Sequence, residues 1–278
     1  MLLTRSIRQL NPLDLLHNAT NTYFPTMKNN NINPNPQLEI IGHRGYSAVT
    51  PENTLASLKS AIAAGVKSVE FDIHASSCGT PVLFHDDTLN RTTNGLGPLK
   101  CNTFRQLQDL DAGKWFSEEF SGEKIPSLIE AINQLNGQID CIYVEVKGVW
   151  EFQNLDIMIQ IIRETNFVDK TTFLSMDWDI MDQIRCRDPG LGIGFIVETS
   201  DRFDKALKRV EGKSNAILDL SHTLSLENPY MIDQAHKIGI DVVVWTVNNI
   251  DEARRLKDIG VTRFTTDQIE LLLGWAAS

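Results

Sequence analysis

The stretch "EIIGHRGYSAVTPENTLASLKSAIAAGVKSVEFDI" (residues 39–73) contains the pattern of one complete strand–helix–strand unit. The apolar run at 39–43 predicts a first strand, and "KSVEFDI" at 67–73 predicts a second. Between them, "NTLASLKSAIAAG" has apolar residues at helical spacing and ends at Gly65, a typical helix terminator. The stretch therefore predicts one β/α unit of a parallel sheet.

The same alternation continues along the chain. Further short apolar, β-branched runs occupy residues 139–146, 171–175, 192–197, 216–220, 241–247 and 262–266, with helix-like segments between nearly all of them. Together with the first two strands, this makes eight, and eight strands alternating with helices predict an α/β fold, the (β/α)8 TIM barrel. The chain of 278 residues suits one such domain, which commonly occupies about 250 residues.

One run does not fit the alternation. "PVLFHD" (81–86) follows the second strand after only "HASSCGT", which is too short for a parallel crossover of a dozen or more residues. We expect this run to fold back as a hairpin, which returns His85 to the neighbourhood of Asp72. Residues 90–125 are rich in Gly, Asn and Thr and predict a small insertion after strand 2.

The beginning of the chain differs in composition from the rest. "MLLTRSIRQLNPLDLL" is compatible with a short amphipathic helix, and "MKNNNINPNPQ" is Asn/Pro-rich linker material. We predict an N-terminal extension or linker at residues 1–37 and the barrel domain at 38–278. The two arginines near the start, without a nearby acidic residue, leave a weak organelle-targeting interpretation open.

Composition narrows the partners and the compartment. The formal net charge of −10 disfavours nucleic acid and anionic membrane surfaces as main partners. No apolar run reaches the roughly 18 residues of a membrane span, so we expect no stable membrane insertion. Four dispersed cysteines without a C-x-x-C pair favour free thiols and a cytoplasmic location: Cys78, Cys101, Cys141 and Cys186. The sequence does not indicate an oligomeric state.

Acidic side chains gather where the predicted strands end. Glu70 and Asp72 lie two residues apart, so strand periodicity puts them on one face, and Glu145 and Lys147 repeat the arrangement on the next strand. TIM barrels place their chemistry at the C-terminal ends of strands, where these side chains meet. Three carboxylates suit Mg²⁺ or Ca²⁺ better than zinc, which favours His and Cys ligands.

Two histidines are then free for proton transfer. His43 follows the first strand and His85 the hairpin run, so one can withdraw a proton from a nucleophile while the other donates one to a leaving oxygen. Arg44 and Lys147 supply positive charge. Metal, cations and two histidines indicate phosphoryl transfer rather than acyl transfer. No nucleophile elbow, P-loop or dinucleotide fingerprint indicates another chemistry.

At this point the sequence resembles the glycerophosphodiester phosphodiesterases. The resemblance covers roughly residues 39–272 in order. The motifs that carry it are "HRG" (43–45), "PENTLAS" (51–57), "VEFDI" (69–73), "PVLFHDDTLNRTTNG" (81–95), "DAGKWF" (111–116), "IPSLIEAI" (125–132), "VEVK" (144–147), "WTVN" (245–248) and "TTD" (265–267). The resemblance implies the PLC-like phosphodiesterase type of TIM barrel, with residues 90–125 as the family's small insertion.

The resemblance also implies roles for individual residues. The expected divalent-metal ligands are Glu70, Asp72 and Glu145, and the expected acid/base pair is His43 and His85. By the same resemblance, Arg44 and Lys147 hold the phosphate. Glu52 and Asn53 support the metal and the rim, and Trp245 lines the pocket. The implied reaction is the metal-dependent hydrolysis of glycerophosphodiesters, such as glycerophosphocholine and glycerophosphoethanolamine, to sn-glycerol 3-phosphate and an alcohol. It belongs to lipid and glycerol metabolism, and the resemblance does not say which histidine acts first.

The chain departs from the family pattern in places, and two other functions stay open. Thr262 and Arg263 stand where a usual Asp-Gly precedes the last strand, away from the expected metal ligands. A lysophospholipid-specific, phospholipase D-like enzyme of the same fold would favour an apolar anchor beside the barrel mouth, for which the sequence offers only the N-terminal "MLL...LDLL" stretch. A catalytically silent binding barrel would normally have lost a histidine or a metal carboxylate, and this chain retains all five.

Overall fold

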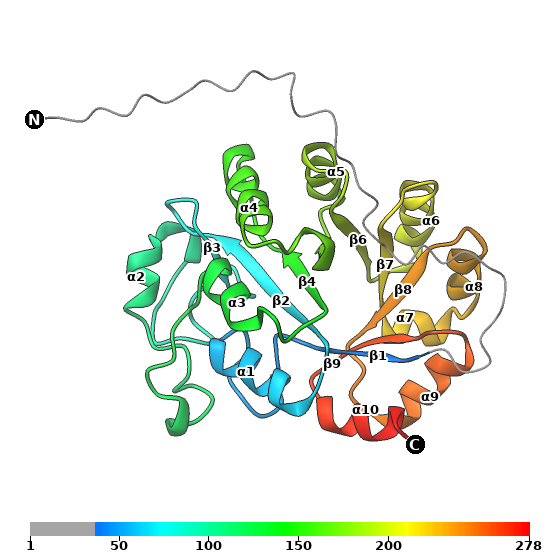
Figure 1. Cartoon of the computed structure of the whole chain (residues 1–278), viewed down its shortest axis with the longest axis horizontal. Helices are drawn as coiled ribbons and strands as arrows, with labels where there is room; N and C mark the ends of the chain where they lie inside the picture. The colour runs from blue at the N-terminus through cyan, green and yellow to red at the C-terminus, as the bar shows by residue number, and fades with distance from the viewer. Residues whose placement is uncertain (1–36) are drawn as a thin grey trace, which may run out of the picture. The chain divides into compact units, whose positions relative to one another are not determined.

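The computed structural model describes residues 37–278, and within them eight parallel strands close into a barrel. Around the barrel, the order is β1, β2, β4, β5, β6, β7, β8 and β9, and β9 pairs with β1. The bounds are β1 Glu39–Gly42, β2 Ser68–Ala75, β4 Cys141–Val146, β5 Thr171–Ser175, β6 Gly192–Val197, β7 Ala216–Ser221, β8 Asp241–Trp245 and β9 Arg263–Thr266. The predicted TIM barrel is confirmed (Figure 1).

Helices lie outside the ring of strands (Figure 1). They are α1 Leu55–Ala64, α3 Leu128–Leu135, α4 Phe152–Glu164, α5 Trp178–Arg187, α6 Ser200–Val210, α7 His222–Glu227, α8 Tyr230–Lys237, α9 Ile250–Asp258 and α10 Ile269–Ala276. The first one shows why the sequence pattern was informative. The Thr54 side chain accepts a hydrogen bond from the Ser57 N–H at its start, and Gly65 ends it in a left-handed conformation with φ of 99°.

Strand alternation divides the apolar residues into two packed groups. Within the barrel lie Ile41, Tyr143, Leu174, Ile196, Ile217 and Val243. Their neighbours in sequence, such as Phe173 and Val197, belong to the larger core that contains the buried side chains of the surrounding helices. The charged residues further along β2 and β4 lie beyond this apolar interior, at the C-terminal mouth.

The hairpin that interrupts the alternation is present as expected. Strand β3, Pro81–Leu83, runs antiparallel to the last three residues of β2, and the first two residues of β2 pair with β1. Both partners use the same edge of β2, because its other edge pairs with β4. The Phe84 N–H donates to the Asp72 carbonyl oxygen at 3.0 Å, which brings His85 beside Asp72.

The insertion after β3 has its own small core. It contains the 3₁₀ turns η1 Leu99–Cys101 and η2 Glu118–Phe120 and the short helix α2 Phe104–Gln108. A separate apolar cluster packs beneath it: Val82, Phe84, Leu89, Leu99, Leu107, Ala112 and Ile125. The predicted insertion at about 90–125 is therefore a folded element attached to the side of the barrel where His85 lies.

Other expectations have mixed outcomes. The predicted extension at 1–37 lies outside the described residues except for Gln37, so its boundary with the barrel domain stays a prediction. Within residues 37–278, no helix has both the length and the apolar character needed to cross a bilayer.

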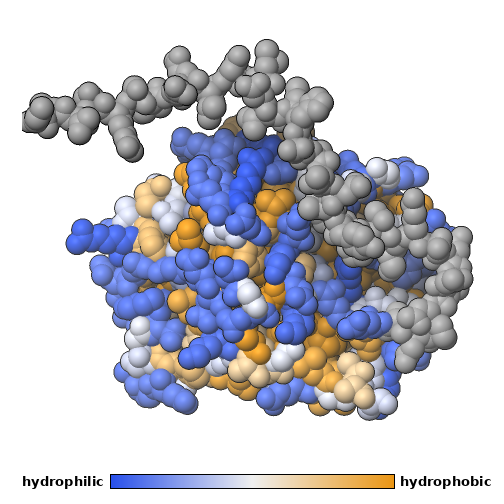
Figure 2. Space-filling model, viewed as in Figure 1, coloured by the Kyte–Doolittle hydropathy of each residue, from blue (hydrophilic) through white to orange (hydrophobic). Residues whose placement is uncertain are grey.

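All four cysteines are free, and three of them are exposed. Figure 2 shows polar residues over much of the face turned to the reader, with apolar residues between them.

Arg263, which departs from the family pattern, lies at the start of β9, at the end of the barrel opposite the mouth. Its Nε lies 3.2 Å from Glu39 Oε2, and its Nη2 lies 3.3 Å from Asp241 Oδ2. Glu39 also accepts hydrogen bonds from the hydroxyls of Ser68 and Tyr143. The pairing of β1 with β9 continues past Arg263, because the Glu39 N–H donates to the Thr262 carbonyl oxygen at 2.8 Å. Arg263 therefore joins the starts of three neighbouring strands, β1, β8 and β9.

We predict that Arg263→Met lowers the free energy of unfolding by about 1–3 kcal/mol, because Glu39 and Asp241 lose a shared ion-pair partner whose guanidinium is partly buried. Urea denaturation measures this change. The control is Arg254→Met, which removes a more exposed ion pair with Asp251 and should cost less than about 1 kcal/mol. Equal stability of the two variants would contradict the bracing role of Arg263.

Candidate active site

The loop after β1 makes a sharp left-handed turn that aims the first two polar residues into the mouth. Arg44 has φ of 54° and Gly45 has φ of 82°. A Cβ atom at Gly45 would lie 2.6 Å from the Ser57 carbonyl carbon, so only glycine fits against α1 at this position. A hydrogen bond from α1 stabilises the turn: the Ser57 hydroxyl donates to the Arg44 carbonyl oxygen at 2.7 Å.

Three carboxylates converge at the mouth, where β2 and β4 lie side by side. One oxygen from each of Glu70, Asp72 and Glu145 lies within 4.8 Å of the others. Burial, together with the negative charge of its neighbours, raises the pKa of Glu70 well above its usual range. Burial and the charge of Asp72 likewise raise the pKa of Glu145 to about 7. The cluster therefore resists holding three negative charges without a cation.

Two basic side chains partly neutralise the cluster. Lys147 Nζ lies 2.6 Å from Glu145 Oε1 and 3.4 Å from Asp72 Oδ1, and Arg44 Nε lies 3.3 Å from Asp72 Oδ2. Asn53 exchanges two hydrogen bonds with Asp72, one to the carboxylate and one from the backbone N–H. Burial opposes ionisation of Asp72, but Arg44 and Lys147 outweigh it and hold the pKa of Asp72 below its usual range.

The residues present fit a hard divalent cation. The side chain of Asp72 is 1% exposed, yet its Oδ1 accepts no hydrogen bond. Lys147 Nζ, 3.4 Å away, offers it an ion pair but no hydrogen bond. A buried polar atom without a hydrogen bond is costly, and a bound cation would satisfy this one. Carboxylate oxygens are the ligands that Mg²⁺ and Ca²⁺ prefer. Glu70, Asp72 and Glu145 are therefore the group that could hold such an ion.

His43 is oriented by an aspartate from the last strand of the barrel. Its Nδ1 lies 2.6 Å from Asp267 Oδ1, and Asp267 also accepts hydrogen bonds from the Ser47 hydroxyl and the Asn248 amide. Burial opposes ionisation, but these donors and the charge of His43 hold the pKa of Asp267 below its usual range. An ionised carboxylate only accepts, so Nδ1 carries the proton, and Nε2 faces the cluster, 4.0 Å from Glu70 Oε2.

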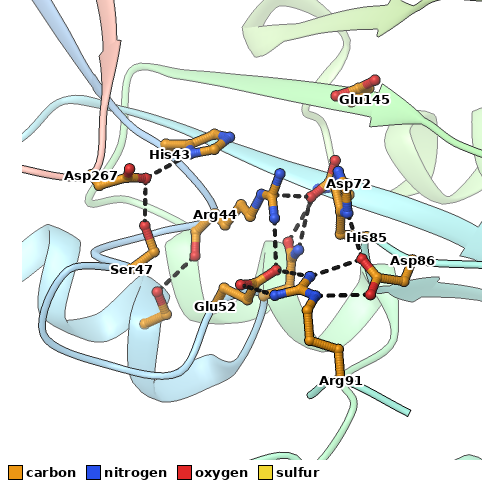
Figure 3. Close-up of polar contacts among 12 residues, drawn as sticks. His43, Arg44, Ser47, Glu52, Asp72, His85, Asp86, Arg91, Glu145 and Asp267 are labelled. Carbon is orange, nitrogen blue, oxygen red and sulfur yellow. Dashed lines mark hydrogen bonds and ion pairs between the residues drawn. The ribbon is translucent and has the colours of Figure 1, made fainter. Parts of the chain in front are cut away.

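His85 is oriented in the same way by a different aspartate. Its Nδ1 lies 2.7 Å from Asp86 Oδ1, and Asp86 is bound in turn by the guanidinium of Arg91. His74 fixes the backbone of this segment, because its Nε2 lies 3.0 Å from the His85 carbonyl oxygen. Burial lowers the pKa of His85, as do the nearby charges of Arg44 and Lys147. In Figure 3, the two histidines lie on opposite sides of Arg44.

The structure gathers nine of the ten expected site residues into one network of contacts. Glu52 belongs to it through Arg44, whose Nη1 donates to Glu52 Oε1 at 2.7 Å. Trp245 is the exception: it lies at the end of β8, half-buried, and its Nε1 contacts the Asp219 carbonyl oxygen at 3.4 Å.

Sequence analysis missed the residues that orient the histidines. They are Asp86, Arg91 and Asp267, with Ser47 and Asn248 around Asp267. For four of them, the available signal was their position inside the motifs "PVLFHDDTLNRTTNG", "TTD" and "WTVN", which did not reveal their contacts. Ser47 lies outside every motif, and the only signal for it was its place three residues after Arg44.

Comparisons with known proteins agree with this geometry. Residues 43–271 match the sequence model of the Glycerophosphoryl diester phosphodiesterase family. A glycerophosphodiester phosphodiesterase from Caldanaerobacter subterraneus subsp. tengcongensis is 30% identical over 239 residues, covering 84% of this chain and 96% of that protein. The structure of an Oleispira antarctica phosphodiesterase in complex with the product sn-glycerol-3-phosphate has a TM-score of 0.81 at 28% identity, covering 86% of this chain and 97% of that one.

A barrel whose mouth combines an acidic cluster, two oriented imidazoles and two basic side chains has the features of a phosphodiesterase. The family match extends over most of the described residues, and the relative from Caldanaerobacter aligns along nearly its whole length. The chain belongs to the glycerophosphoryl diester phosphodiesterase family, and it is an enzyme, a phosphoric diester hydrolase.

We predict that divalent-cation binding strengthens as the pH rises from 6 to 8. Glu145, whose pKa is raised to about 7, is mostly protonated at the lower pH and mostly ionised at the higher one. Because protons compete with the metal, the apparent Kd for Ca²⁺ should fall about tenfold over this range from this one group. Isothermal titration calorimetry of the metal-free protein measures it.

The matched control for that titration is Glu145→Gln, which keeps the shape of the side chain and removes the titrating group. This variant should bind Ca²⁺ more weakly at pH 8 and show a smaller change between pH 6 and 8. Tight binding that is independent of pH in the unaltered protein would show that the ion binds elsewhere.

Proposed function

We propose that this enzyme hydrolyses glycerophosphodiesters, such as glycerophosphocholine and glycerophosphoethanolamine, to sn-glycerol 3-phosphate and an alcohol. The observation that carries the proposal is the convergence of Glu70, Asp72 and Glu145 at a mouth that also holds two histidines, each with its Nδ1 on an aspartate. The related Oleispira antarctica phosphodiesterase holds sn-glycerol-3-phosphate as its product, which supports this class of substrate.

The proposal includes a divalent cation, Mg²⁺ or Ca²⁺, held by Glu70, Asp72 and Glu145. When bound, the ion supplies positive charge that neutralises the phosphate and favours ionisation of a nearby hydroxyl. Arg44 and Lys147 lie directly beside two of these carboxylates, which supports their assignment to the remaining phosphate oxygens.

The two histidines carry the protons. Nε2 of one histidine takes the proton of the glycerol 2-hydroxyl as its oxygen attacks phosphorus, and the other histidine protonates the leaving alcohol. The P–O bond to the alcohol breaks, leaving a cyclic phosphate. Water then opens the ring with the two roles reversed, which restores both protonation states. Because each histidine has its Nδ1 on a carboxylate, either His43 or His85 can act first.

The remaining expected residues act around this centre. Asn53 and Glu52 hold Asp72 and Arg44 in place through the hydrogen bonds described above. Trp245 presents a half-buried indole at the end of β8, and we assign it to packing against the glycerol carbons. The substrate is a small molecule, and we propose neither a nucleic-acid partner nor membrane insertion. The cytoplasmic location stays a prediction.

A lysophospholipid substrate is a second candidate, and one observation favours it. The loop between β4 and α4, which begins just after Lys147, carries Val149 at 86% exposure, and Phe152 at the start of α4 is 67% exposed. Large apolar side chains this exposed beside a catalytic mouth are the kind of surface that an acyl chain would cover. The sequence had offered only the N-terminal stretch for such an anchor, and that stretch lies outside the described residues.

We predict that the purified protein releases sn-glycerol 3-phosphate from glycerophosphocholine, that EDTA abolishes the release and that Mg²⁺ or Ca²⁺ restores it. The reason is that the carboxylates alone repel the phosphate. An enzyme-coupled assay for glycerol 3-phosphate measures the rate. Lysophosphatidylcholine vesicles assayed in parallel decide between the two candidates, since faster hydrolysis of the lysolipid would replace the first proposal with the second.

The same assay tests the histidines. His43→Ala and His85→Ala should each lower kcat/KM by about 10²–10⁴-fold, the usual contribution of a positioned acid or base. His236→Ala, in the last turn of α8, is the control and should leave the rate unchanged. Undiminished hydrolysis by His43→Ala or His85→Ala would overturn the two-histidine mechanism.

A further inference from the structure

Arg91 belongs to the insertion, yet its guanidinium reaches the catalytic mouth. Its Nε and Nη2 donate to the two oxygens of Asp86, each at 2.8 Å. Its Nη1 and Nη2 donate to the two oxygens of Glu52, again at 2.8 Å. Arg91 therefore forms two bidentate ion pairs with residues of two separate loops, one after β1 and one after β3 (Figure 3).

These contacts form an unbroken chain of shared atoms. Asp86 Oδ1 bonds both His85 Nδ1 and Arg91 Nη2. Glu52 Oε1 bonds both Arg91 Nη2 and Arg44 Nη1. Arg44 Nε in turn lies 3.3 Å from Asp72 Oδ2. The chain thus runs from one imidazole, through Arg91, to the phosphate-binding arginine and a metal carboxylate.

The charges along this chain alternate in sign. Asp86, Arg91, Glu52, Arg44 and Asp72 are negative, positive, negative, positive and negative in turn. Without Arg91, two carboxylates would face each other with no cation between them, and the mostly buried Glu52 would keep only Arg44. A lysine restores the charge but lacks the planar fork that makes two bidentate pairs.

The Nδ1 partner of the other histidine lies outside this chain of contacts. His43 is held by Asp267, which is fixed by Ser47 and Asn248, all from the barrel itself. No hydrogen bond or ion pair among residues 37–278 joins Arg91 to that group. The His43 side therefore provides an internal reference for any effect at Arg91.

We propose that Arg91 is a positioning residue, by which the insertion holds His85 and Arg44 in a fixed relation to each other. This inference rests on the proposed function for the roles of His85 and Arg44. It assigns the insertion a part in the reaction: the insertion delivers a side chain that connects the histidine of the hairpin to the arginine of the first loop.

The test compares Arg91→Gln and Arg91→Lys with the unaltered protein in its Mg²⁺-loaded form. Long-range ¹H–¹⁵N NMR spectra report which ring nitrogen of each histidine carries the proton, and kcat and KM for glycerophosphocholine report catalysis. The control is Arg209→Gln, because Arg209 also pairs with two aspartates, Asp179 and Asp182, but at the end of α6. Urea denaturation compares the stability of all variants.

We expect Arg91→Gln to shift the His85 ring nitrogens toward a mixture of tautomers, to leave those of His43 unchanged, and to lower kcat by about 10–100-fold, as is usual for groups that orient an active-site ligand. For Arg91→Lys, both kcat and the tautomer mixture of His85 should lie between those of Arg91→Gln and those of the unaltered protein. Arg209→Gln should change stability alone.

An unchanged His85 spectrum in Arg91→Gln overturns the proposal whatever the kinetics, and so does a kcat within twofold of the unaltered protein. Full recovery by Arg91→Lys also overturns it, because charge alone would then suffice. If the unaltered protein does not hydrolyse glycerophosphocholine, the proposed function fails, and the imidazole spectra still decide the role of Arg91.

Discussion

The structure of the barrel mouth is governed by the burial of three carboxylates at one point. Glu70, Asp72 and Glu145 arrive from two neighbouring strands, and each is largely or wholly withdrawn from water. Buried negative charges are stable only when cations and hydrogen-bond donors surround them. Arg44, Lys147 and Asn53 meet part of this need. Part of the buried negative charge stays uncompensated, so the pKa values of Glu70 and Glu145 are raised and the site fits a divalent cation.

Strand β2 makes this arrangement possible because two partners share one of its edges. Strand β1 pairs with the beginning of β2 and β3 with its end. The edge between these partners is closed by the loop after β1, where the Gly45 N–H donates to the Glu70 carbonyl oxygen at 3.2 Å. The loop that carries His43 and the hairpin that carries His85 therefore approach the cluster from neighbouring positions. A barrel with a simple parallel neighbour at this edge would not bring the second histidine to the three carboxylates.

Much of this could be predicted from the sequence because it depends on local patterns. Strand alternation places Glu70 and Asp72 on one face, and a connection of seven residues cannot support a parallel crossover, so the hairpin follows. The partners of the histidines could not be predicted in this way. Asp267 lies 224 residues from His43, and their contact depends on closure of the barrel between β9 and β1. Arg91 depends on the folding of the insertion, and no periodicity indicates where its guanidinium lies.

The two halves of the site are built differently. The barrel itself orients His43, whereas His85 depends on a hairpin and an insertion that fold against its side. The most direct test of the central claim is a crystal structure with Mn²⁺ and sn-glycerol 3-phosphate, in which anomalous scattering locates the ion. We predict the ion on Glu70, Asp72 and Glu145, with the phosphate beside it and within reach of Nε2 of both His43 and His85. An ion bound elsewhere, or a phosphate remote from both imidazoles, would contradict the claim.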